Sequence, residues 1–344
     1  MSSYKRIKNP NKNSNKHVKN MFLANYDVSL IIKNDTIFCN KKKTQLSALT
    51  KALTQKDTRS AISLIVELHA SGYFLLVFKK LMSHYILHVN LVQPNGILYL
   101  SDFVSYYKSL PYGTEKKCPL RIINDMVIRN FLVFFTTMIC GSNQRSLLKL
   151  IKITNSDFNL ASRKKFLVSS NLSKVKKYIR LSDPKEIIIP MNEIITILTN
   201  KDIMDGEQKI IFWLSWLFEY EKIFHDGHLL VSKRNIIGID EKYYNDFIWI
   251  VWEMIKDVSK EHLTKYIFSL ENIYKYNYTR GSRRKKTNLV IFAILLHLNP
   301  LPKIQIPIQR INRELFKKMQ KESLYVNQRY LQVFNHKYTI DNIP

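Results

Sequence analysis

The amino-acid sequence predicts an all-α protein built from multi-helix bundles. Between Thr44 and Pro94, apolar residues recur every three or four positions, as they do on one face of a helix. The second half of the chain adds two strongly apolar stretches, each with a pair of tryptophans spaced i, i+3. Short connections between such helices favour antiparallel neighbours. We therefore expect two helical halves, with one short β-hairpin near residues 28–38.

The N-terminal region differs from the rest of the chain in composition. Residues 1–20 contain six Lys and Arg, no acid and few apolar side chains. Such a segment cannot bury enough apolar surface to fold, so we expect a disordered basic arm. Alternating apolar residues between Val28 and Ile37, around the turn signal Asn34-Asp35, predict this hairpin or else an extended entry segment.

Three helices are expected between residues 44 and 94. Leu49 and Leu53 share one face of the first helix with Leu46. Asp57 can cap the second helix by accepting a backbone N–H, and Gly72 suits the left-handed position at its end. The apolar residues expected inside the bundle are Ala61, Leu64, Ile65 and Leu68 in the second helix, and Leu75, Phe78, Leu81 and Met82 in the third.

The same stretch follows a family pattern of a leucine helix, a polar turn with Asp, an Ala-rich helix ending in Glu-Leu, and Ser-Gly-Tyr. The matching residues are Lys51, Ala52, Leu53, Asp57, Ala61, Glu67, Leu68, Ser71, Gly72 and Tyr73. Lys79, Lys80 and Leu81 stand where the family has a basic pair and a leucine, and Pro94 lies at the family's spacing. Residues 44–94 thus resemble the helical, collar-like C-terminal region of replication-associated recombination ATPases, which are related to clamp loaders.

This resemblance carries expectations about partners. Since the family's helical region mediates oligomerisation, the resemblance implies a homo-oligomer or a partner ATPase. The pattern departs from the family after the third helix, where Leu87 and His88 replace an acidic pair and Asn90 replaces a glycine. Any role that the acidic pair plays in the family is therefore in doubt here.

Further elements follow in order. We expect helices over Ile97–Leu110, over the apolar run Ile122–Cys140 and, briefly, over Ser146–Ile153. A polar and basic segment at 154–185 ends at Asp183-Pro184 and predicts a domain boundary. The expected organisation is a basic arm at 1–20, a collar-like helical domain at 21–153, a basic linker at 154–185 and a second helical domain at 186–344.

Aromatic residues mark the second half. The pairs Trp213/Trp216 and Trp249/Trp252 suit base-stacking platforms, but aromatics in such apolar helices are more often core, and we expect them inside. The sequence His225-Asp226-Gly227-His228 predicts a loop, because a zinc site needs a further distant ligand. Residues 289–298 predict a buried helix, and residues 309–340 one or two amphipathic helices.

Net charge points to a polyanionic partner. The chain has 54 Lys+Arg against 27 Asp+Glu, a formal net charge of +27. Nucleic acid is the simplest partner for such an excess, with DNA bound at low sequence specificity. An anionic membrane surface or an acidic protein are alternatives, and codon bias in an AT-rich genome, such as that of a large DNA virus, also raises lysine content.

Two basic clusters are the candidate nucleic-acid-binding sites. Guanidinium groups bind phosphate bidentately, and tyrosines stack on bases. The sequence leaves a merely solvated turn open for the second cluster. The candidates are Arg163, Lys164, Lys165, Lys174, Lys176, Lys177 and Arg180 in the first cluster, and Tyr276, Tyr278, Arg280, Arg283, Arg284, Lys285 and Lys286 in the second.

The sequence contains no familiar catalytic motif. A GxxxxGK[ST] phosphate loop is absent, as are GxGxxG, GxSxG, HExxH and paired-cysteine motifs. We therefore expect no enzyme activity, no cofactor and no metal. The expected function is that of an accessory protein of DNA replication or recombination, and the alternative is a viral structural or nucleic-acid-packaging protein.

Location follows from the same composition. Three scattered cysteines and no apolar leader predict an intracellular protein in a reducing compartment. The longest apolar runs are too short to span a bilayer, so we expect a soluble protein with no membrane partner, in the host cytoplasm or nucleus if it is viral.

Overall fold

The protein is all-α, as the sequence predicts. The computed structural model describes residues 35–36, 38–111, 119–164, 167–169, 171–301, 328–329 and 332. In that part of the chain, β-structure is limited to isolated bridges, Asp35 with Lys41 and Leu230 with Asp246. The basic arm at 1–20, most of the hairpin at 28–38 and nearly all of the helices expected at 309–340 lie outside the described residues.

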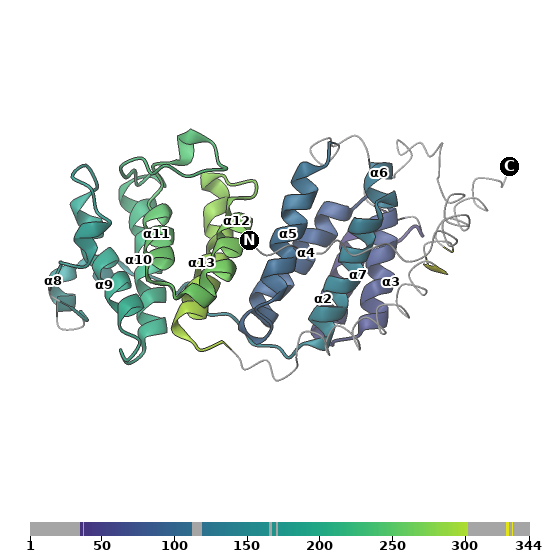
Figure 1. Cartoon of the computed structure of the whole chain (residues 1–344), viewed down its shortest axis with the longest axis horizontal. Coiled ribbons are helices and arrows are strands. Elements are labelled where there is room, and N and C mark those ends of the chain that lie inside the picture. The colour runs from purple at the N-terminus through teal and green to yellow at the C-terminus, as the bar shows by residue number, and fades with distance from the viewer. Residues whose placement is uncertain are drawn as a thin grey trace, which may run out of the picture.

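A first helical unit precedes residue 142 (Figure 1). Its helices are α2 (Lys42–Thr54), α3 (Thr58–Ala70), α4 (Phe74–His84), α5 (Gly96–Ser109), α6 (Pro119–Asn124) and α7 (Met126–Gly141). The π-helix η3 (Tyr85–Val89) and the 3-10 turn η4 (Asn90–Val92) join α4 to α5. The rings of Phe103 and Phe131 stack with centroids 3.7 Å apart, which fixes α5 against α7.

The local signals in the three-helix stretch are confirmed. Asp57 accepts a hydrogen bond of 3.1 Å from the backbone N–H of Ser60 and so caps α3. Gly72 has a φ of +81°, the left-handed conformation that glycine adopts without steric cost. Leu53 and Leu81 are fully buried. The expectation that Leu75 points inward is wrong, because it is 44% exposed.

Two other expectations for the first unit need correction. The run from Ile122 to Cys140 is two helices, because the Asp125 side chain accepts the backbone N–H groups of Val127 and Ile128 and starts α7 there. Residues 146–153 are not helical and have no regular secondary structure. Backbone hydrogen bonds explain this: nearby Arg145 and Leu147 donate to carbonyls of the π-helix, at 2.7 and 2.9 Å.

A second helical unit, largely teal to green in Figure 1, follows this non-helical segment. Its helices are α8 (Leu160–Arg163), α9 (Ile188–Thr199), α10 (Gly206–Phe224), α11 (Ile248–Val258), α12 (Glu261–Lys275) and α13 (Arg283–Leu298). The predicted core position of all four tryptophans is confirmed, since each is at most 4% exposed. Trp216 stacks on Tyr220, whereas Trp249 and Trp252 both pack on Tyr274.

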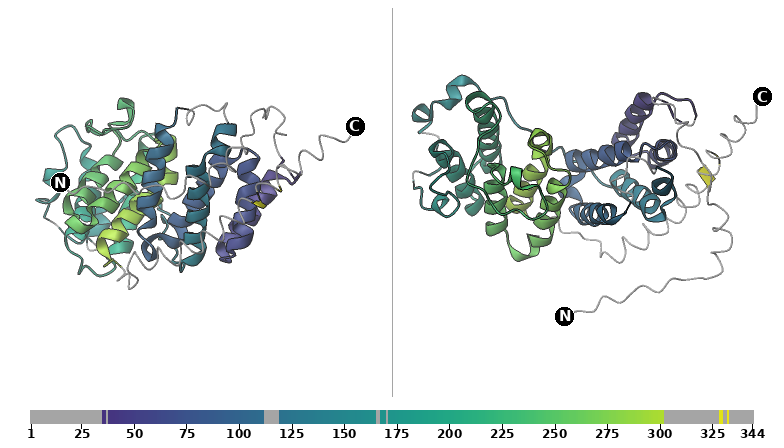
Figure 2. Two further views of the ribbon diagram at one scale, coloured as in Figure 1. Left: turned by 45° about the vertical axis from the view of Figure 1, so that its right-hand side comes forward. Right: turned by 90° about the horizontal axis from the view of Figure 1, so that it is seen from above.

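The two units meet along α5 and α12, which lie side by side in both Figure 1 and Figure 2. The hydroxyl of Tyr266 donates to Asn95 Oδ1 at 2.7 Å, and the amide of Asn272 donates to Ser101 Oγ at 2.9 Å. One continuous apolar core runs through both units. Among the described residues, no helix combines the length and the apolar character that a membrane span needs.

Candidate nucleic-acid interface

The basic segment 171–185 packs along the second unit. Its 3-10 turn η7 (Val175–Lys177) buries Val175, and the ring of Tyr178 is also buried. The Tyr178 hydroxyl donates to Asp257 Oδ2 near the end of α11, at 2.6 Å. Because these two side chains point inward, the lysines between and beside them are turned to solvent.

A buried ion pair fastens the end of this segment. Arg234 Nη1 and Nη2 lie 2.9 and 2.8 Å from the two carboxylate oxygens of Asp183. Burial by itself raises the pKa of Asp183, but hydrogen bonds from Arg234 and from the backbone N–H groups of Arg180 and Ser232 lower that pKa to about 2. The carboxylate is therefore ionised at neutral pH and holds Arg234 in place.

Two of the predicted basic residues of this segment lie at the ends of helices. Lys174 Nζ lies 2.7 Å from Thr199 Oγ1, at the end of α9. Lys177 Nζ lies 2.7 Å from Asp257 Oδ2, at the end of α11. Arg180 donates to the carbonyl of Lys233 at 2.5 Å, and Lys176 is exposed.

Three further lysines, which the sequence did not single out, lie near the basic residues of this segment. Lys201 and Lys260 follow α9 and α11, and the ammonium of Lys260 adds to burial in lowering the pKa of Lys201. Lys233 lies beside Arg180. Lysines near helix C-termini are favoured by the negative end of the helix dipole. We call the set of Lys174, Lys176, Lys177, Arg180, Lys201, Lys233 and Lys260 the basic band.

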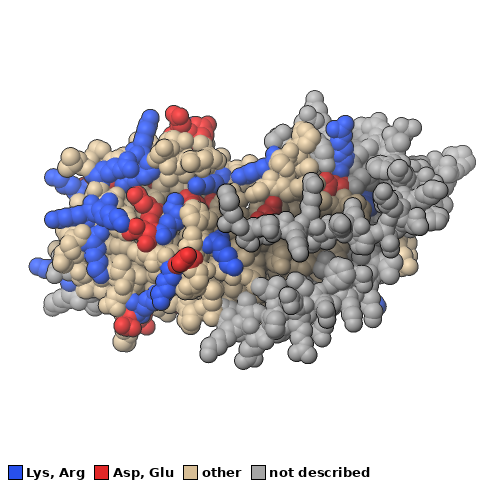
Figure 3. All heavy atoms as spheres, in the orientation of Figure 1, with Lys and Arg blue, Asp and Glu red and all other residues tan. Residues whose placement is uncertain are grey.

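Every residue of the basic band is exposed. The acids Glu253 and Asp257 lie within it, and Asp257 pairs with Lys177, so the positive charge of the band is reduced but not cancelled. Figure 3 shows that Lys and Arg outnumber Asp and Glu on one face of the second unit. The band is apparent only in the three-dimensional structure, because its members come from four separate parts of the chain: residues 174–180, Lys201, Lys233 and Lys260.

The remaining candidates of the first cluster lie elsewhere. Arg163, at the end of α8, pairs with Asp157 and lies over the Phe212 ring, 4.4 Å from its centroid. Lys164 is exposed, and Lys165 lies outside the described residues. A guanidinium that is already paired and stacked contributes less to a phosphate-binding surface than the free end of an exposed lysine.

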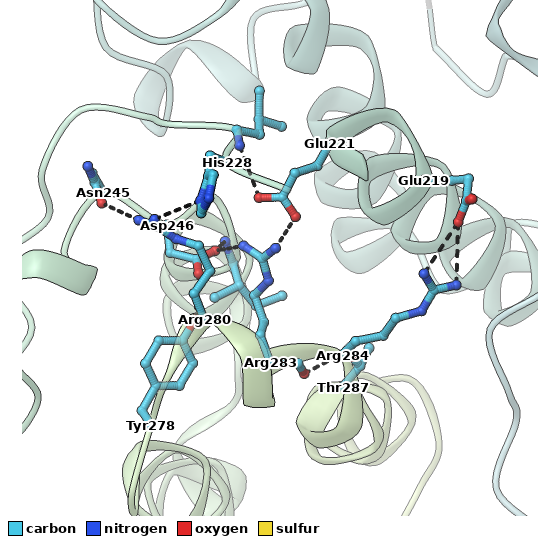
Figure 4. Close-up of polar contacts among 12 residues, drawn as sticks. Glu219, Glu221, His228, Asn245, Asp246, Tyr278, Arg280, Arg283, Arg284 and Thr287 are labelled. Atoms are coloured by element: carbon cyan, nitrogen blue, oxygen red, sulfur yellow. Dashed lines mark hydrogen bonds and ion pairs between the residues drawn. The ribbon is translucent and has the colours of Figure 1, made fainter. Parts of the chain in front are cut away.

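The second predicted cluster is largely a structural element. We expected Tyr278 and Arg283 to be exposed on a loop, and this is wrong, because both are buried. Figure 4 shows their polar contacts. Arg283 begins α13 and forms ion pairs with Glu221 and with Asp246, whose Oδ1 lies 2.5 Å from Nη1. The Tyr278 hydroxyl donates to the other oxygen of Asp246 at 2.5 Å.

The buried arrangement satisfies its charges internally. Glu221 accepts the backbone N–H of Leu229 at 3.0 Å, and the Arg283 guanidinium lies over the rings of Phe218 and Phe247. Burial lowers the pKa of Arg283 to about 9, which leaves it charged at neutral pH. Arg283 therefore joins α13 to α10 and to the start of α11, and it is unavailable to a ligand.

Of the other members of the second cluster, some side chains bond to groups of the protein and some are exposed to solvent. Arg280 donates to Asn245 Oδ1 at 3.0 Å, and Arg284 lies 3.4 Å from Glu219. Lys286 donates to the carbonyls of Tyr274 and Tyr276 at the end of α12, and burial lowers its pKa to about 8. Tyr276 is half-buried, and Lys285 is exposed.

The loop prediction for residues 225–228 is confirmed. His225 ends α10, and Asp226 and Gly227 have φ of +48° and +77°, as in a tight turn. Within the described ranges, no group of three or more His, Cys, Asp or Glu side chains is placed to hold a metal ion.

Comparison with known proteins adds no relative. No family model, no curated protein and no solved structure matches the chain.

Proposed function

We propose that this protein is a non-enzymatic accessory factor of DNA replication or recombination, which binds nucleic acid through the basic band. The observation that carries the proposal is a cluster of exposed cations, with Lys174 and Lys201 at the end of α9, Lys177 and Lys260 at the end of α11, and Arg180 beside Lys233. Ammonium groups neutralise phosphates and release counterions, which supplies affinity without reading bases. The resemblance of residues 44–94 to the collar-like region supports the link to replication, and with it a homo-oligomer or a partner ATPase.

Low sequence specificity follows from the composition of the band. Its cations are six lysines and one arginine, and four of the lysines lie at or just beyond helix ends. Bases are read by bidentate Arg, Asn or Gln contacts in a groove, which need a protruding helix or ribbon. A surface of lysines instead contacts the phosphate backbone, which is the same in every sequence.

The binding experiment uses fluorescence anisotropy with labelled duplex and single-stranded DNA of two unrelated sequences. We expect each form of DNA to bind with affinities that agree between sequences. The band variant carries Lys176→Ala, Arg180→Ala, Lys233→Ala and Lys260→Ala. The control variant carries Lys51→Ala, Lys79→Ala, Lys149→Ala and Lys152→Ala, which removes equal charge from other exposed positions. Equal affinity of the two variants would contradict the proposal.

The non-enzymatic part of the proposal has its own experiment. Because the sequence lacks a phosphate loop, purified protein should not hydrolyse ATP in the presence or absence of DNA. The non-enzymatic proposal would be contradicted if the protein released inorganic phosphate from ATP and a single substitution in this chain abolished that release.

A further inference from the structure

The exposed face of α12 carries a phenylalanine ring that is open to solvent. Phe268 is 56% exposed and is not part of the apolar core. Tyr99 is also exposed, but its ring lies against Phe134, with the centroids 4.8 Å apart. The exposed ring of Phe224 likewise lies against Tyr220, at 4.9 Å. In the part of the chain that the structure describes, no ring packs on Phe268 in this way.

Cations of the basic band stand at the start of α12. Lys260 immediately precedes the helix, and after burial its ammonium is a further cause of the lowered pKa of Lys201. Lys265, one turn into α12, is exposed, and its Nζ lies 5.0 Å from the centroid of the Tyr266 ring. At 1.5 Å per residue, Phe268 follows Lys260 by about 12 Å along the helix. The ring is therefore close to the band.

A second group of cations stands at the other end of α12. Lys108 belongs to α5, which lies beside α12 (Figure 1), and its Nζ lies 5.5 Å from the centroid of the Tyr276 ring. Burial, and then the ammonium of Lys275, lowers the pKa of Lys108. Lys286 donates to the carbonyl of Tyr276, and its pKa is lowered by burial and then by Lys108. Helix α12 thus connects these cations with the basic band.

Acids do not cancel the charge along this helix. Helix α12 contains two acids, and the buried one, Glu271, pairs with Lys256 and Lys275 at 3.0 Å each. The other, Glu261, is exposed in the first turn, where the helix dipole favours a carboxylate. The neighbouring α5 adds one exposed acid, Asp102. The exposed lysines at the two ends and in the middle of α12 outnumber these two exposed acids.

An exposed ring between cations favours single strands over duplex as its ligand. The bases of a duplex are stacked on one another, whereas an unpaired base can stack on an aromatic side chain while lysines neutralise the phosphates. The sequence predicted this role for Tyr276 and Tyr278, but Tyr276 is half-buried and Tyr278 is buried. Phe268 has the exposure that these two tyrosines lack.

We propose that a single strand of DNA runs from the basic band along the exposed face of α12, and that Phe268 stacks on one of its bases. This inference rests on the proposed function, because the band anchors the strand. Lys265 and Lys108 contact its phosphates. Every base has an aromatic face, so stacking adds affinity for single strands without adding sequence specificity.

The test measures fluorescence anisotropy of a labelled oligothymidine, either alone or annealed to oligoadenine. Phe268→Ala should weaken binding of the single strand at least about fivefold and binding of the duplex less than about twofold. Phe224→Ala is the matched control, because it removes an equally exposed ring from the end of α10 and should change neither affinity. Circular dichroism verifies the folding of both variants.

Two conservative variants separate stacking from a general apolar contact. Phe268→Leu keeps an apolar side chain and should lose affinity for the single strand as Phe268→Ala does, whereas Phe268→Trp should retain it. The four native tryptophans are buried, so an indole at position 268 is the exposed one. Its fluorescence should be quenched by oligothymidine and not by the duplex, since only an unpaired base stacks on it.

The phosphate contacts have a separate measurement. Lys265→Ala should flatten the salt dependence of single-strand binding by about 0.7 units, the value for one phosphate contact on a single strand. Lys51→Ala removes an exposed lysine from α2 and should leave that slope unchanged. Equal slopes for Lys265→Ala and wild type would exclude α12 from the path of the strand.

Failure of this inference differs from failure of the proposed function. If the band variant loses affinity for both forms of DNA while Phe268→Ala binds the single strand as wild type does, the proposed function stands and stacking by Phe268 is wrong. Equal losses for Phe268→Ala and Phe224→Ala, or equal losses for single strand and duplex, would also overturn the inference. Wild-type affinity of the band variant for both forms would instead contradict the proposed function.

Discussion

The guanidinium of Arg234 is paired with both carboxylate oxygens of Asp183, at 2.9 and 2.8 Å, and both side chains are buried. Arg234 also donates to the carbonyls of Tyr178 and Ser232. The pair therefore fixes the segment that carries Lys174 to Arg180 against the loop that precedes α11. The basic band depends on this attachment, because four of its seven cations lie on that segment.

Asp183→Asn should destabilise the protein strongly. The substitution leaves the buried guanidinium of Arg234 without a compensating charge, and loss of one partner of a buried pair costs about 3–5 kcal/mol. Urea unfolding followed by circular dichroism measures the change. Asp240→Asn is the control, since its partner Lys242 is exposed and the pair lies at the surface. Equal stability of the two variants would contradict the buried pair.

The effect of Asp183→Asn should depend on pH. The folded protein lowers the pKa of Asp183 from its ordinary value of 3.8 to about 2. A lowered pKa stabilises the folded protein above the unfolded pKa, and this stabilisation is lost as pH falls through the folded pKa. The difference in unfolding free energy between wild type and variant should therefore be largest above about pH 4 and shrink toward pH 2. A difference that grows as pH falls would have the wrong sign.

Arg283 and Arg284 are adjacent in sequence, but substitution should destabilise the protein strongly at Arg283 and hardly at all at Arg284. Arg283→Met leaves the buried carboxylates of Glu221 and Asp246 without their cation, at a cost of about 3–5 kcal/mol. Arg284→Met removes only an exposed contact with Glu219 and should change stability by less than about 0.5 kcal/mol. Thermal unfolding of the two variants makes the comparison. A greater loss for Arg284→Met would exclude the buried position of Arg283.

A pair of leucines on α4 tests the core of the first unit. Leu81 is fully buried and Leu75 is 44% exposed. Leu81→Ala should therefore cost about 2–5 kcal/mol, while Leu75→Ala should stay within about 0.5 kcal/mol of wild type. Denaturant unfolding measures both. Similar losses at the two positions would mean that α4 presents a different face to the core.

Local signals in the sequence predicted much of the fold. The cap at Asp57 and the left-handed glycine at Gly72 act within a few residues, so the sequence is sufficient to identify them. The periodicity of α4 predicted the helix and the buried positions of Phe78 and Leu81, but Leu75 was assigned to the wrong side. Residues 146–153 have helical periodicity, yet the segment is not helical, and the backbone N–H groups of Arg145 and Leu147 bond to carbonyls of η3 instead.

The candidate site was less predictable, because charges are paired across long sequence separations. The partners of Arg283 lie 37 and 62 residues earlier in the chain, at Asp246 and Glu221. The dense run of Arg and Lys between Arg280 and Lys286 was therefore predicted to be exposed, although Arg283 within it is buried. Conversely, Lys201 and Lys260 are isolated in the sequence, and only the packing of α9 against α11 brings them into the basic band.

The salt dependence of DNA binding tests the central claim most directly. Each neutralised phosphate contributes a slope of about −0.9 to a plot of log affinity against log salt on duplex DNA. The band variant, which lacks four cations, should have a slope that is flatter than wild type by up to about four units, while the control variant, with equal charge removed elsewhere, should keep the wild-type slope. Identical slopes for wild type and the band variant would contradict nucleic-acid binding through the basic band.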